Sequence, residues 1–512
     1  LSIYRTNHAV YGRACVSSAF YRNKINSSAS NPRKLFSLFS SLLNPPLPPP
    51  PSCLTADDFV NYLTQKVKDI SSSFIPASIL PPPIPSSVFT QFIPLTSDEV
   101  NRIITSNHAT TCPLDAIPSS LLQDVSSDIV PSLTSTINSS LTSGIVPASF
   151  KTARIKPLLK KPTLNTTDIQ NYRPVSLILY LSKTLERAVA NQLSSYFSSN
   201  NLLDPHQSGF KKAHSTETAL LAVTESLRAA RAPSLSSVLI LLDLSAAFDT
   251  VNHQILLATL AELGIAESAL SWFTSYLTNR TYQVTWNGSL SKPCTLETGV
   301  PQGSVLGPLL FSLYTRSLGS VIASHGFSYH CYADDTQLFL SFPSSEKTLI
   351  ATRISECQAD VSTWTTAHHL RLNLNKTELL LIPGKDCPHM DLLVTVENIT
   401  VSPSPTARNL GVVLDNQLCC TANITAVARS CRFALCNIRR IRPFLTREAA
   451  QLLVQSLVIS RLDYCNSLLA GLPASAIKPL QRIQNAAARL VFNLPKFSHV
   501  TPLAPCSSSH QF

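Results

Sequence analysis

The sequence lacks the features of membrane and secreted proteins. It has no unbroken apolar run of the ~18 residues that a spanning helix needs, and no basic stretch followed by an apolar leader. We therefore expect an intracellular protein that does not bind membranes. The 13 cysteines are odd in number, are scattered and include no C-x-x-C pair, which argues against a disulfide framework and a zinc ribbon.

Methionine is almost absent, and charge is sparse. The only methionine is Met390 and the chain begins at Leu1, so we expect a fragment of a longer frame with flanking domains missing. Only 14% of the residues are charged, with a net charge of +11, which favours an acidic partner without naming one. The 512 residues are enough for two to four packed units.

Proline divides the N-terminal part of the chain. Runs of proline at 45–51 and 81–85 favour polyproline II spacers. We expect residues 1–95 to be a basic helical and Pro-rich linker, partly disordered, with a short helix from Ala56 to Ile70. Residues 97–100, Ser-Asp-Glu-Val, indicate a helix start with acids in its first turn.

The central region indicates mixed α and β structure. The apolar run from Val238 to Leu244 predicts a buried strand, and a buried strand tolerates a carboxylate such as Asp243 mainly when something binds it. Two further strands are expected within 327–342, with Asp334 and Asp335 at their bend. The other elements expected here are helices at 245–263, 304–324 and 345–367, a hairpin at 282–296, and strands at 378–382, 392–396 and 410–414.

The segment after residue 423 reads as all-helical and strongly basic. Residues 425–500 contain 11 Lys or Arg and two acids, a net charge of +9. A solvated helix face would explain one such helix, whereas the whole segment favours contact with a nucleic-acid backbone.

The adjacent carboxylates Asp334 and Asp335 indicate a divalent metal, because neighbouring carboxylates repel unless a cation neutralises them. Asp243 as a third acid would complete a site for two ions ~3.5–4 Å apart, of the kind used in phosphoryl transfer. The alternative is an ordinary turn or cap pair.

Seven motifs, in family order, resemble those of reverse transcriptases. The segment Leu242–Asp249 resembles the first carboxylate motif, and Tyr332–Asp335 resembles the catalytic hairpin. The other motifs are Asn171–Ser176, Gln207–Phe210, Gly299–Pro308, Leu374–Thr377 and Asn409–Gly411. The alanine at 333 and the stretch 150–161 are similar to the LINE-type, non-long-terminal-repeat (non-LTR) retrotransposon branch.

This resemblance implies an α/β chain with an α+β palm, arranged as a right-hand polymerase. The N-terminal extension and fingers would span 96–236, the palm 237–415 and the helical thumb 416–500. The reverse transcriptase domain itself would cover about 145–415, and 501–512 would be a disordered tail.

The implied activity is RNA-directed DNA synthesis, in which a DNA primer is extended on an RNA template from deoxynucleotides. Asp243, Asp334 and Asp335 would be catalytic and would bind two Mg²⁺ ions, with Mn²⁺ possible. Lys376 would protonate the leaving pyrophosphate, or be a plain surface lysine.

The resemblance also assigns contacts to the nucleotide and to the primer and template. Triphosphate contacts fall to Arg173, to Lys160 (or Lys161, or neither if both are exposed hairpin residues) and to backbone N–H groups from Leu244 onward. Phe248 would exclude a 2′-hydroxyl, unless it is only a core residue. Gln302 and Gly303 would orient the nucleotide. Primer and template contacts fall to Gly299, Tyr332, Leu410 and Gly411.

Two departures from the family pattern keep a second interpretation open. Residues 177–180, Leu-Ile-Leu-Tyr, and Lys211 differ from what family members often carry. The second interpretation is a decayed retrotransposon fragment that only binds nucleic acid. The related full-length proteins usually carry an endonuclease, for which 1–95 is too short and too Pro-rich, so we expect that domain to be missing. Integration would take the protein to the nucleus.

Overall fold

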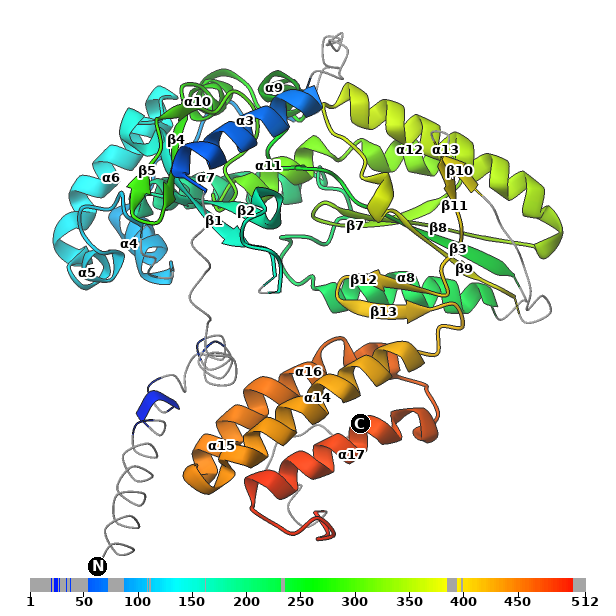
Figure 1. The fold of residues 1–512 in the computed structure, drawn as a ribbon. Coiled ribbons are helices and arrows are strands. Elements are labelled where there is room, and N and C mark those ends of the chain that lie inside the picture. The colour runs from blue at the N-terminus through cyan, green and yellow to red at the C-terminus, as the bar shows by residue number, and fades with distance from the viewer. Residues whose placement is uncertain are drawn as a thin grey trace, which may run out of the picture.

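The computed structural model has a mixed α/β architecture (Figure 1). It describes residues 54–71, 87–107, 112–161, 163–231, 235–384, 394–396 and 399–500, with residue 109 and a few isolated positions between 20 and 37. The two proline runs and the tail 501–512 lie outside the described residues. The short helix expected from Ala56 is confirmed as α3 (Ala56–Ser71).

A four-stranded antiparallel sheet forms the centre of the molecule. Its order is β7 (Ser328–Tyr332), β8 (Asp335–Phe342), β3 (Ser236–Leu242) and β9 (Glu378–Ile382). Successive side chains of a strand point to opposite faces. The β3 side chains Val238, Ile240 and Leu242 therefore enter one core, while Leu239 enters another. Both faces are covered, which explains the unbroken apolar run.

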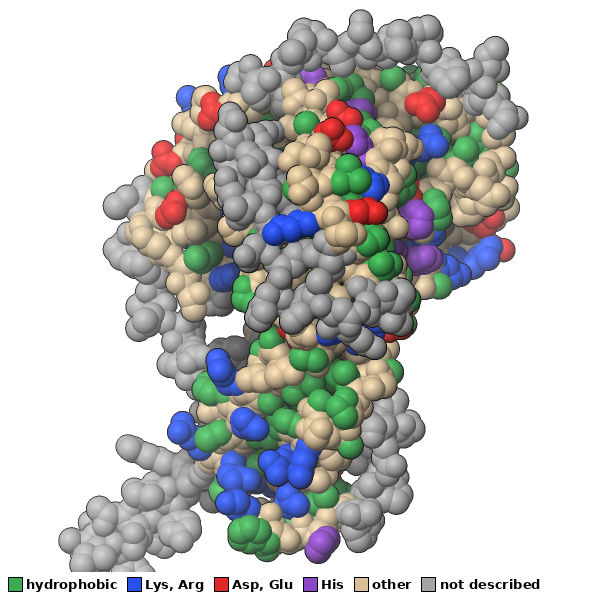
Figure 2. Space-filling model, turned by 90° about the vertical axis from the view of Figure 1, so that its right-hand side faces the viewer, with side chains coloured by type: hydrophobic (Ala, Val, Ile, Leu, Met, Phe, Trp, Pro, Cys, Tyr) green, Lys and Arg blue, Asp and Glu red, His purple; other side chains and the backbone are tan. Residues whose placement is uncertain are grey.

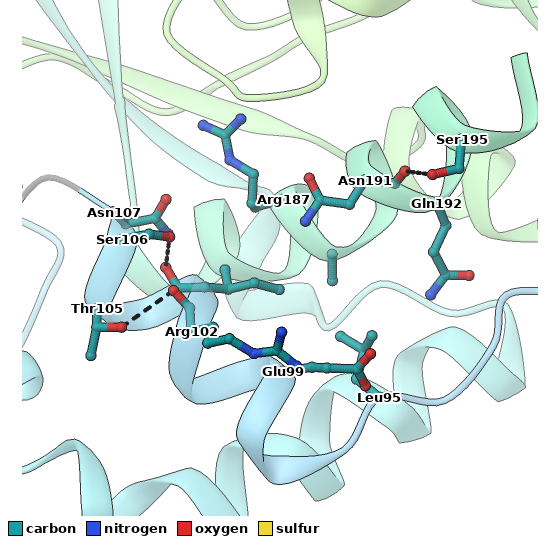
Figure 3. Close-up of a pocket in the computed structure, with 12 residues that line it drawn as sticks. Leu95, Glu99, Arg102, Thr105, Ser106, Asn107, Arg187, Asn191, Gln192 and Ser195 are labelled. Atoms are coloured by element: carbon teal, nitrogen blue, oxygen red, sulfur yellow. Dashed lines mark hydrogen bonds between the residues drawn. The ribbon is translucent and has the colours of Figure 1, made fainter. Parts of the chain in front are cut away.

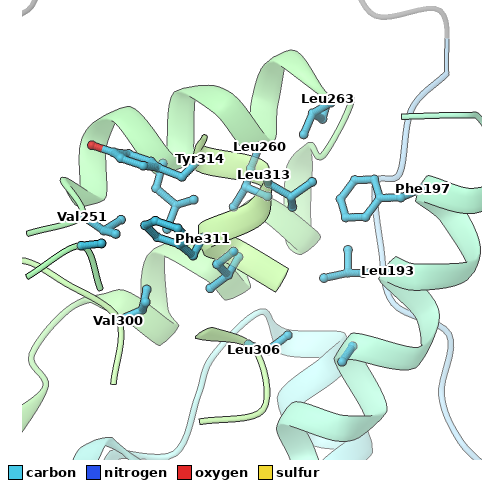
Figure 4. Packing of buried hydrophobic residues seen from close by; sticks show 14 of the residues in the cluster. Leu193, Phe197, Val251, Leu260, Leu263, Val300, Leu306, Phe311, Leu313 and Tyr314 are labelled. Atoms are coloured by element: carbon cyan, nitrogen blue, oxygen red, sulfur yellow. The ribbon is translucent and has the colours of Figure 1, made fainter. Parts of the chain in front are cut away.

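Helices cover one face of this sheet. They include α9 (His253–Glu262), α11 (Gly307–Tyr314), α12 (Leu318–Ser324) and α13 (Lys347–Ala367). Figure 4 shows how Phe197 of α7 (Tyr180–Ser199), Leu260 of α9 and Leu313 of α11 contribute to one buried cluster. The other face packs against α8 (Thr216–Arg231) and the hairpin of β12 (Thr406–Asn409) and β13 (Val412–Asp415).

A second sheet lies beside the first. Its order is β2 (Tyr172–Ile178), β1 (Thr152–Leu159), β4 (Thr281–Trp286) and β5 (Ser289–Leu290), with β6 (Cys294–Thr295) also paired to β4. Its neighbours are α3, α4 (Ser97–Ser106), α5 (Ser119–Asp124), α6 (Ser126–Ser143) and α10 (Glu267–Leu277). The expected helix start at 97 is confirmed, and Thr96 and Glu99 cap it reciprocally.

The C-terminal part of the chain is helical, as expected. It comprises α14 (Thr421–Ile441), α15 (Arg447–Val454), α16 (Ser460–Asp463) and α17 (Ala474–Val491), which share their own apolar core. Figure 1 shows these helices below the hairpin of β12 and β13. A small ladder of β10 (Val394–Val396) and β11 (Ile399–Val401) completes the strands described. Across the described ranges, no helix is both long and apolar enough to span a bilayer.

Two helix predictions were wrong in their extent. Residues 245–250 form turns, with Ala246 at φ 52°, and the helix begins only at His253 because the Asn252 side chain accepts from the N–H groups of Gln254 and Ile255. The segment 304–324 is two helices, since Ser304 accepts from the Gly307 N–H before the first and the chain turns at 315–317 before the second.

Candidate active site

Sheet register brings the three predicted carboxylates to one end of the central sheet. Leu242 is opposite Thr336 in the β3–β8 ladder, and Tyr332 is opposite Asp335 in the β7–β8 hairpin. Asp243 directly follows Leu242, so it emerges beside Asp335, and Asp334 occupies the turn of the hairpin. An antiparallel ladder therefore places the acids together although ~90 residues separate them along the chain.

Electrostatics agree with this proximity. Burial, followed by the charges of Asp334 and Asp243, raises the pKa of Asp335 to about 6. Burial and the Asp243 charge also raise the pKa of Asp334, against the opposing effect of Arg173 and Lys376. Like charges raise a carboxyl pKa when they lie within several ångströms. The three acids thus repel one another across a shared space.

Asp243 already has two hydrogen-bond donors. Lys376 Nζ lies 3.0 Å from Asp243 Oδ2 and Asn373 Nδ2 lies 3.1 Å from the same oxygen. Lys376 is the last residue of a short 3₁₀ helix (Leu374–Lys376), and the Asn373 N–H just before this helix donates to the Asp243 carbonyl. Lys376 is exposed, but its ammonium contacts a predicted catalytic acid.

The donor set suits a hard divalent cation, because Mg²⁺ and Mn²⁺ prefer carboxylate oxygens. The acids do not yet form a ready-made ligand cluster: within the described ranges, no three Asp, Glu, His or Cys side chains converge closely enough to hold a metal ion. Instead, the Lys376 ammonium forms an ion pair with Asp243 Oδ2.

Gln207 fixes the turn between β7 and β8, where the predicted catalytic acids lie. Its Oε1 accepts from the N–H groups of Ala333 (2.9 Å) and Gly209 (2.8 Å), and its Nε2 donates to the Ala333 carbonyl (3.2 Å). The Ser208 N–H also donates to the Cys331 carbonyl, so the segment pairs with β7 as a short parallel bridge. This contact was not predicted. Gly209 was the available signal, because a Cβ there would come within 2.3 Å of the Ala333 nitrogen.

The loop that carries Gln302 contacts two other segments, one at Asp249 and one at Ser176. Gln302 Nε2 donates to Asp249 Oδ1 at 2.8 Å, and its carbonyl accepts from the Ser176 N–H. Gly299 and Gly303 have φ of 87° and 116°, and a Cβ at either would meet a backbone oxygen at 2.7 and 2.6 Å, respectively. At both glycines the missing side chain therefore allows close approach to this chain's own backbone.

A buried carboxylate that the motifs did not single out anchors the next part of this loop. Glu186 of α7 is 1% exposed and accepts from the N–H groups of Val305 (2.7 Å) and Leu306 (3.1 Å). Burial raises its pKa, which the nearby Arg280 guanidinium opposes. An acid on the buried face of a helix was the only sequence signal.

Phe248 stacks on Phe311 of α11, with ring centroids 4.5 Å apart, and remains half-buried. The ring is therefore held in place while part of it stays accessible. The preceding turn offers donors: within the described residues, the N–H groups of Ala246, Ala247 and Phe248 have no acceptor. Leu244 pairs with Leu372, and the Ser245 N–H is already used by the Arg371 carbonyl.

The predicted triphosphate cations lie on the β1–β2 hairpin. Arg173 of β2 is exposed and close enough to influence Asp334. Lys160 donates to the Gln170 carbonyl at 2.6 Å, which favours the hairpin alternative for this residue. Burial, and then the cations Lys66, Lys376 and Arg173, lower the pKa of Lys160. These side chains share one electropositive environment.

The hairpin turn Leu410-Gly411 joins the central sheet to the C-terminal helices. Tyr464 Oη donates to the Leu410 carbonyl at 2.6 Å. On the other side, the buried Asn409 Nδ2 donates to Gln337 Oε1 of β8 at 2.7 Å. Tyr332 is half-buried at the end of β7.

A cavity of about 880 Å³, lined by both polar and apolar side chains, lies apart from these residues. Figure 3 shows it between α4 and α7, with Arg102 and Arg187 among its lining side chains. It contains none of the predicted site residues.

An antiparallel sheet with acids at one end, a braced hairpin and a glutamine loop is consistent with the palm-type domain of template-copying polymerases. Residues 159–414, half of the chain, match the family described as reverse transcriptase (RNA-dependent DNA polymerase). The chain therefore belongs to the reverse transcriptase family.

The relatives are proteins of mobile elements. The chain is 28% identical over 365 residues to the probable RNA-directed DNA polymerase from transposon BS of Drosophila melanogaster, a match covering 70% of this chain and 40% of that protein. It is 27% identical over 390 residues to the RNA-directed DNA polymerase from mobile element jockey of Drosophila funebris, covering 73% and 41%. The chain thus spans about two fifths of these relatives, and the resemblance to LINE-type, non-LTR reverse transcriptases is confirmed.

Proposed function

We propose that this chain is the polymerase part of a LINE-type retrotransposon protein and extends a DNA 3′-hydroxyl on an RNA template. The observation that supports it most is the register that brings Asp243, Asp334 and Asp335 to one sheet end. The central sheet would act as the palm, the second sheet and its helices as the fingers, and the helices of 416–500 as the thumb. The strands β4 to β6 lie within the expected palm range but pair with the fingers sheet.

The three acids would hold divalent ions, Mg²⁺ or alternatively Mn²⁺, which would neutralise negative charge on the phosphates when bound. Lys376 would leave Asp243 and stand next to the leaving pyrophosphate, where its ammonium can donate a proton. Asn373 would keep Asp243 oriented throughout, because it holds the same carboxylate oxygen and does not change charge.

Positioning of the nucleotide would fall to groups already fixed by packing. Arg173 offers a fork of donors to phosphate oxygens. The N–H groups of Ala246 to Phe248 are already held in place by the fold, so they can donate to phosphate oxygens without a free-energy cost for reorganising the backbone. Phe248, held by Phe311, would exclude a 2′-hydroxyl by bulk, and Gln302, held by Asp249, would orient the base pair.

The C-terminal helices would hold the primer–template duplex. Figure 2 shows Lys and Arg gathered on this lower part of the molecule, where no acidic side chain is visible on the face shown. On α14, the exposed arginines lie on one face with the exposed Phe433: Arg429, Arg432, Arg439 and Arg440. Basic side chains with an aromatic among them suit a phosphate backbone.

Primer extension tests the proposal. We expect the protein to extend a DNA primer on an RNA template with deoxynucleotides and Mg²⁺, and chelation of the metal to stop extension. Failure of folded protein to extend any primer with either metal would reject the proposal. The longer relatives fit an endonuclease that lies outside this chain, so we expect no nicking of duplex DNA, and a nuclear site of action for the full-length protein.

One observation favours a second candidate, a nucleic-acid binder without synthesis. The Lys376 ammonium pairs with Asp243, where a metal would have to bind. The departure at Tyr180 does not add to this case, because the side chain is 1% exposed and its hydroxyl donates to the Ile104 carbonyl at 2.7 Å, as in an intact core. Salt-sensitive duplex binding without extension would support the binder.

A further inference from the structure

The helix α3 lies before the segment that matches the reverse transcriptase family, and it packs on the second sheet. Phe59 is 2% exposed and contacts the rings of Tyr172 and Trp286, with centroids 5.2 and 4.7 Å away. The Lys292 N–H donates to the Asp57 carboxylate, and Thr64 Oγ1 lies 3.3 Å from Tyr282 Oη. These contacts fix the rotation of the helix about its axis.

Lys66 lies on the packed face of this helix. Phe59, Leu63, Lys66 and Ile70 are spaced 4, 3 and 4 residues apart, which places them on one side of a helix. The other three are apolar side chains that contact the body of the molecule or are buried. Within the described ranges, Lys66 makes no hydrogen bond or ion pair. Lys66 is half-buried, so part of its side chain stays accessible and its ammonium is free to contact an anionic ligand.

A cavity of about 330 Å³ opens beside Lys66. Its lining joins α3 to the segment after Asp243 and to the irregular segment bonded to it at Arg371: Tyr62, Gln65, Lys66, Asp69, Ile70, Ser245 and Arg371. Gln65 Nε2 donates to Asp69 Oδ1 at 2.6 Å. Lys66 and Arg371 therefore line the same cavity as Ser245, the residue that precedes the free N–H groups of Ala246 to Phe248. Lys66 is also near enough to influence both Asp249, which holds Gln302, and Lys160.

We propose that Lys66 contacts the triphosphate of the incoming deoxynucleotide, so that α3 completes a nucleotide site whose other parts lie within residues 159–414. This inference rests on the proposed function. The cavity is of a size that holds a small ligand. Its two cations, next to unpaired backbone donors, are the chemistry that recognises phosphate oxygens.

The test is the variant Lys66→Met, which keeps the apolar stem and removes the charge. We expect the KM for deoxynucleotide to rise about tenfold, as for loss of one hydrogen bond to a charged group, with kcat and primer–template affinity unchanged. Lys66→Arg should restore KM. The control is Lys68→Met, because Lys68 is exposed and lies on the other side of the same helix.

Two results would overturn the inference: an unchanged KM in Lys66→Met, or a weaker primer–template affinity in place of the KM change. Equilibrium binding of a fluorescent deoxynucleotide is measured on the same proteins. Equal binding by wild type and Lys66→Met would refute the role of Lys66 even if no primer is extended. Loss of binding only in Lys66→Met, with no extension by wild type, would reject the polymerase proposal and keep the contact.

Discussion

The end of the central sheet and the face of α14 use charge in opposite ways. At the sheet end, strand register places three carboxylates together, so each of them occupies a defined position in the sheet or its turn. On α14, four exposed arginines share a helix face without fixed partners in the described structure. A site built from register can be broken by one residue, whereas a diffuse charged face can only be weakened by degrees.

The largest expected effect comes from removing one carboxylate of the hairpin. Asp334→Ala should lower primer extension by about a thousandfold or more, because charge neutralisation is the main contribution to phosphoryl transfer. Extension rates at saturating nucleotide would show it. Asp128→Ala is the matched control, since Asp128 is exposed in the first turn of α6. If both variants extended equally well, the sheet end would not be the catalytic site.

The brace on the hairpin is expected to have the second largest effect. Gln207→Ala removes two acceptor contacts and one donor contact that fix Ala333 and Gly209. We expect kcat to fall by about 10- to 100-fold, the range for losing a few buried hydrogen bonds, with KM for nucleotide nearly unchanged. Steady-state kinetics would measure it. A kcat equal to that of wild type would mean that the hairpin holds its geometry without Gln207.

Asp334 and Gln207 also show how far the sequence predicts the structure. The pair Asp334-Asp335 between two apolar runs was enough to predict a hairpin with acids at its bend, because alternation and turn chemistry are local. The contact of Gln207 with Ala333 joins segments more than 120 residues apart, and no local pattern encodes such a contact.

The missed helix start at 253 has a similar cause. Residues 245–250 have helical composition, but the backbone bends with Ala246 at φ 52° and Asn252 begins a new helix. Carbonyls of this segment also accept from the loop around Gly299: the Val300 N–H donates to the Phe248 carbonyl, and Thr298 Oγ1 donates to the Asp249 carbonyl. Tertiary contacts of this kind override local propensity. Lys376 was assigned two alternative roles, and neither predicted its contact with Asp243.

On the basic face, single substitutions should have graded effects. Arg429→Ala should weaken binding of an RNA–DNA duplex by about 2- to 5-fold and lower the slope of log affinity against log salt by about 1. Titrations at several salt concentrations would measure both. A slope that stayed the same would exclude Arg429 from the interface.

Arg442 provides the contrast within the same helical unit. Its guanidinium donates to the carbonyls of Leu490, Leu445 and Val491, so it serves the fold. Arg442→Ala should therefore lower the melting temperature, while the salt slope of the remaining folded protein stays near that of wild type. The opposite pattern would mean that the internal contacts of Arg442 do not persist in solution.

The smallest effect concerns stability at the sheet end. Because the pKa of Asp335 is raised to about 6 in the folded protein, against about 3.9 for a free side chain, the folded state binds the proton more tightly. The stabilisation that comes from this tighter proton binding is fully present below pH ~4 and is lost as the pH rises through about 6.

Asp335→Asn removes the charge, so without divalent ions it should raise the melting temperature at pH 7.5 by roughly 1–3 °C and leave it unchanged at pH 4. Thermal melts at both values would measure this. Neighbouring atoms crowd the carboxylate and raise its pKa, but the residue as a whole remains accessible to solvent, so screening keeps the gain small. If Asp335→Asn melted at a lower temperature than wild type at pH 7.5, the charge of Asp335 would stabilise the fold through partners other than a metal. The contrast between repelling acids at the sheet end and the diffuse basic face of α14 would then be wrong.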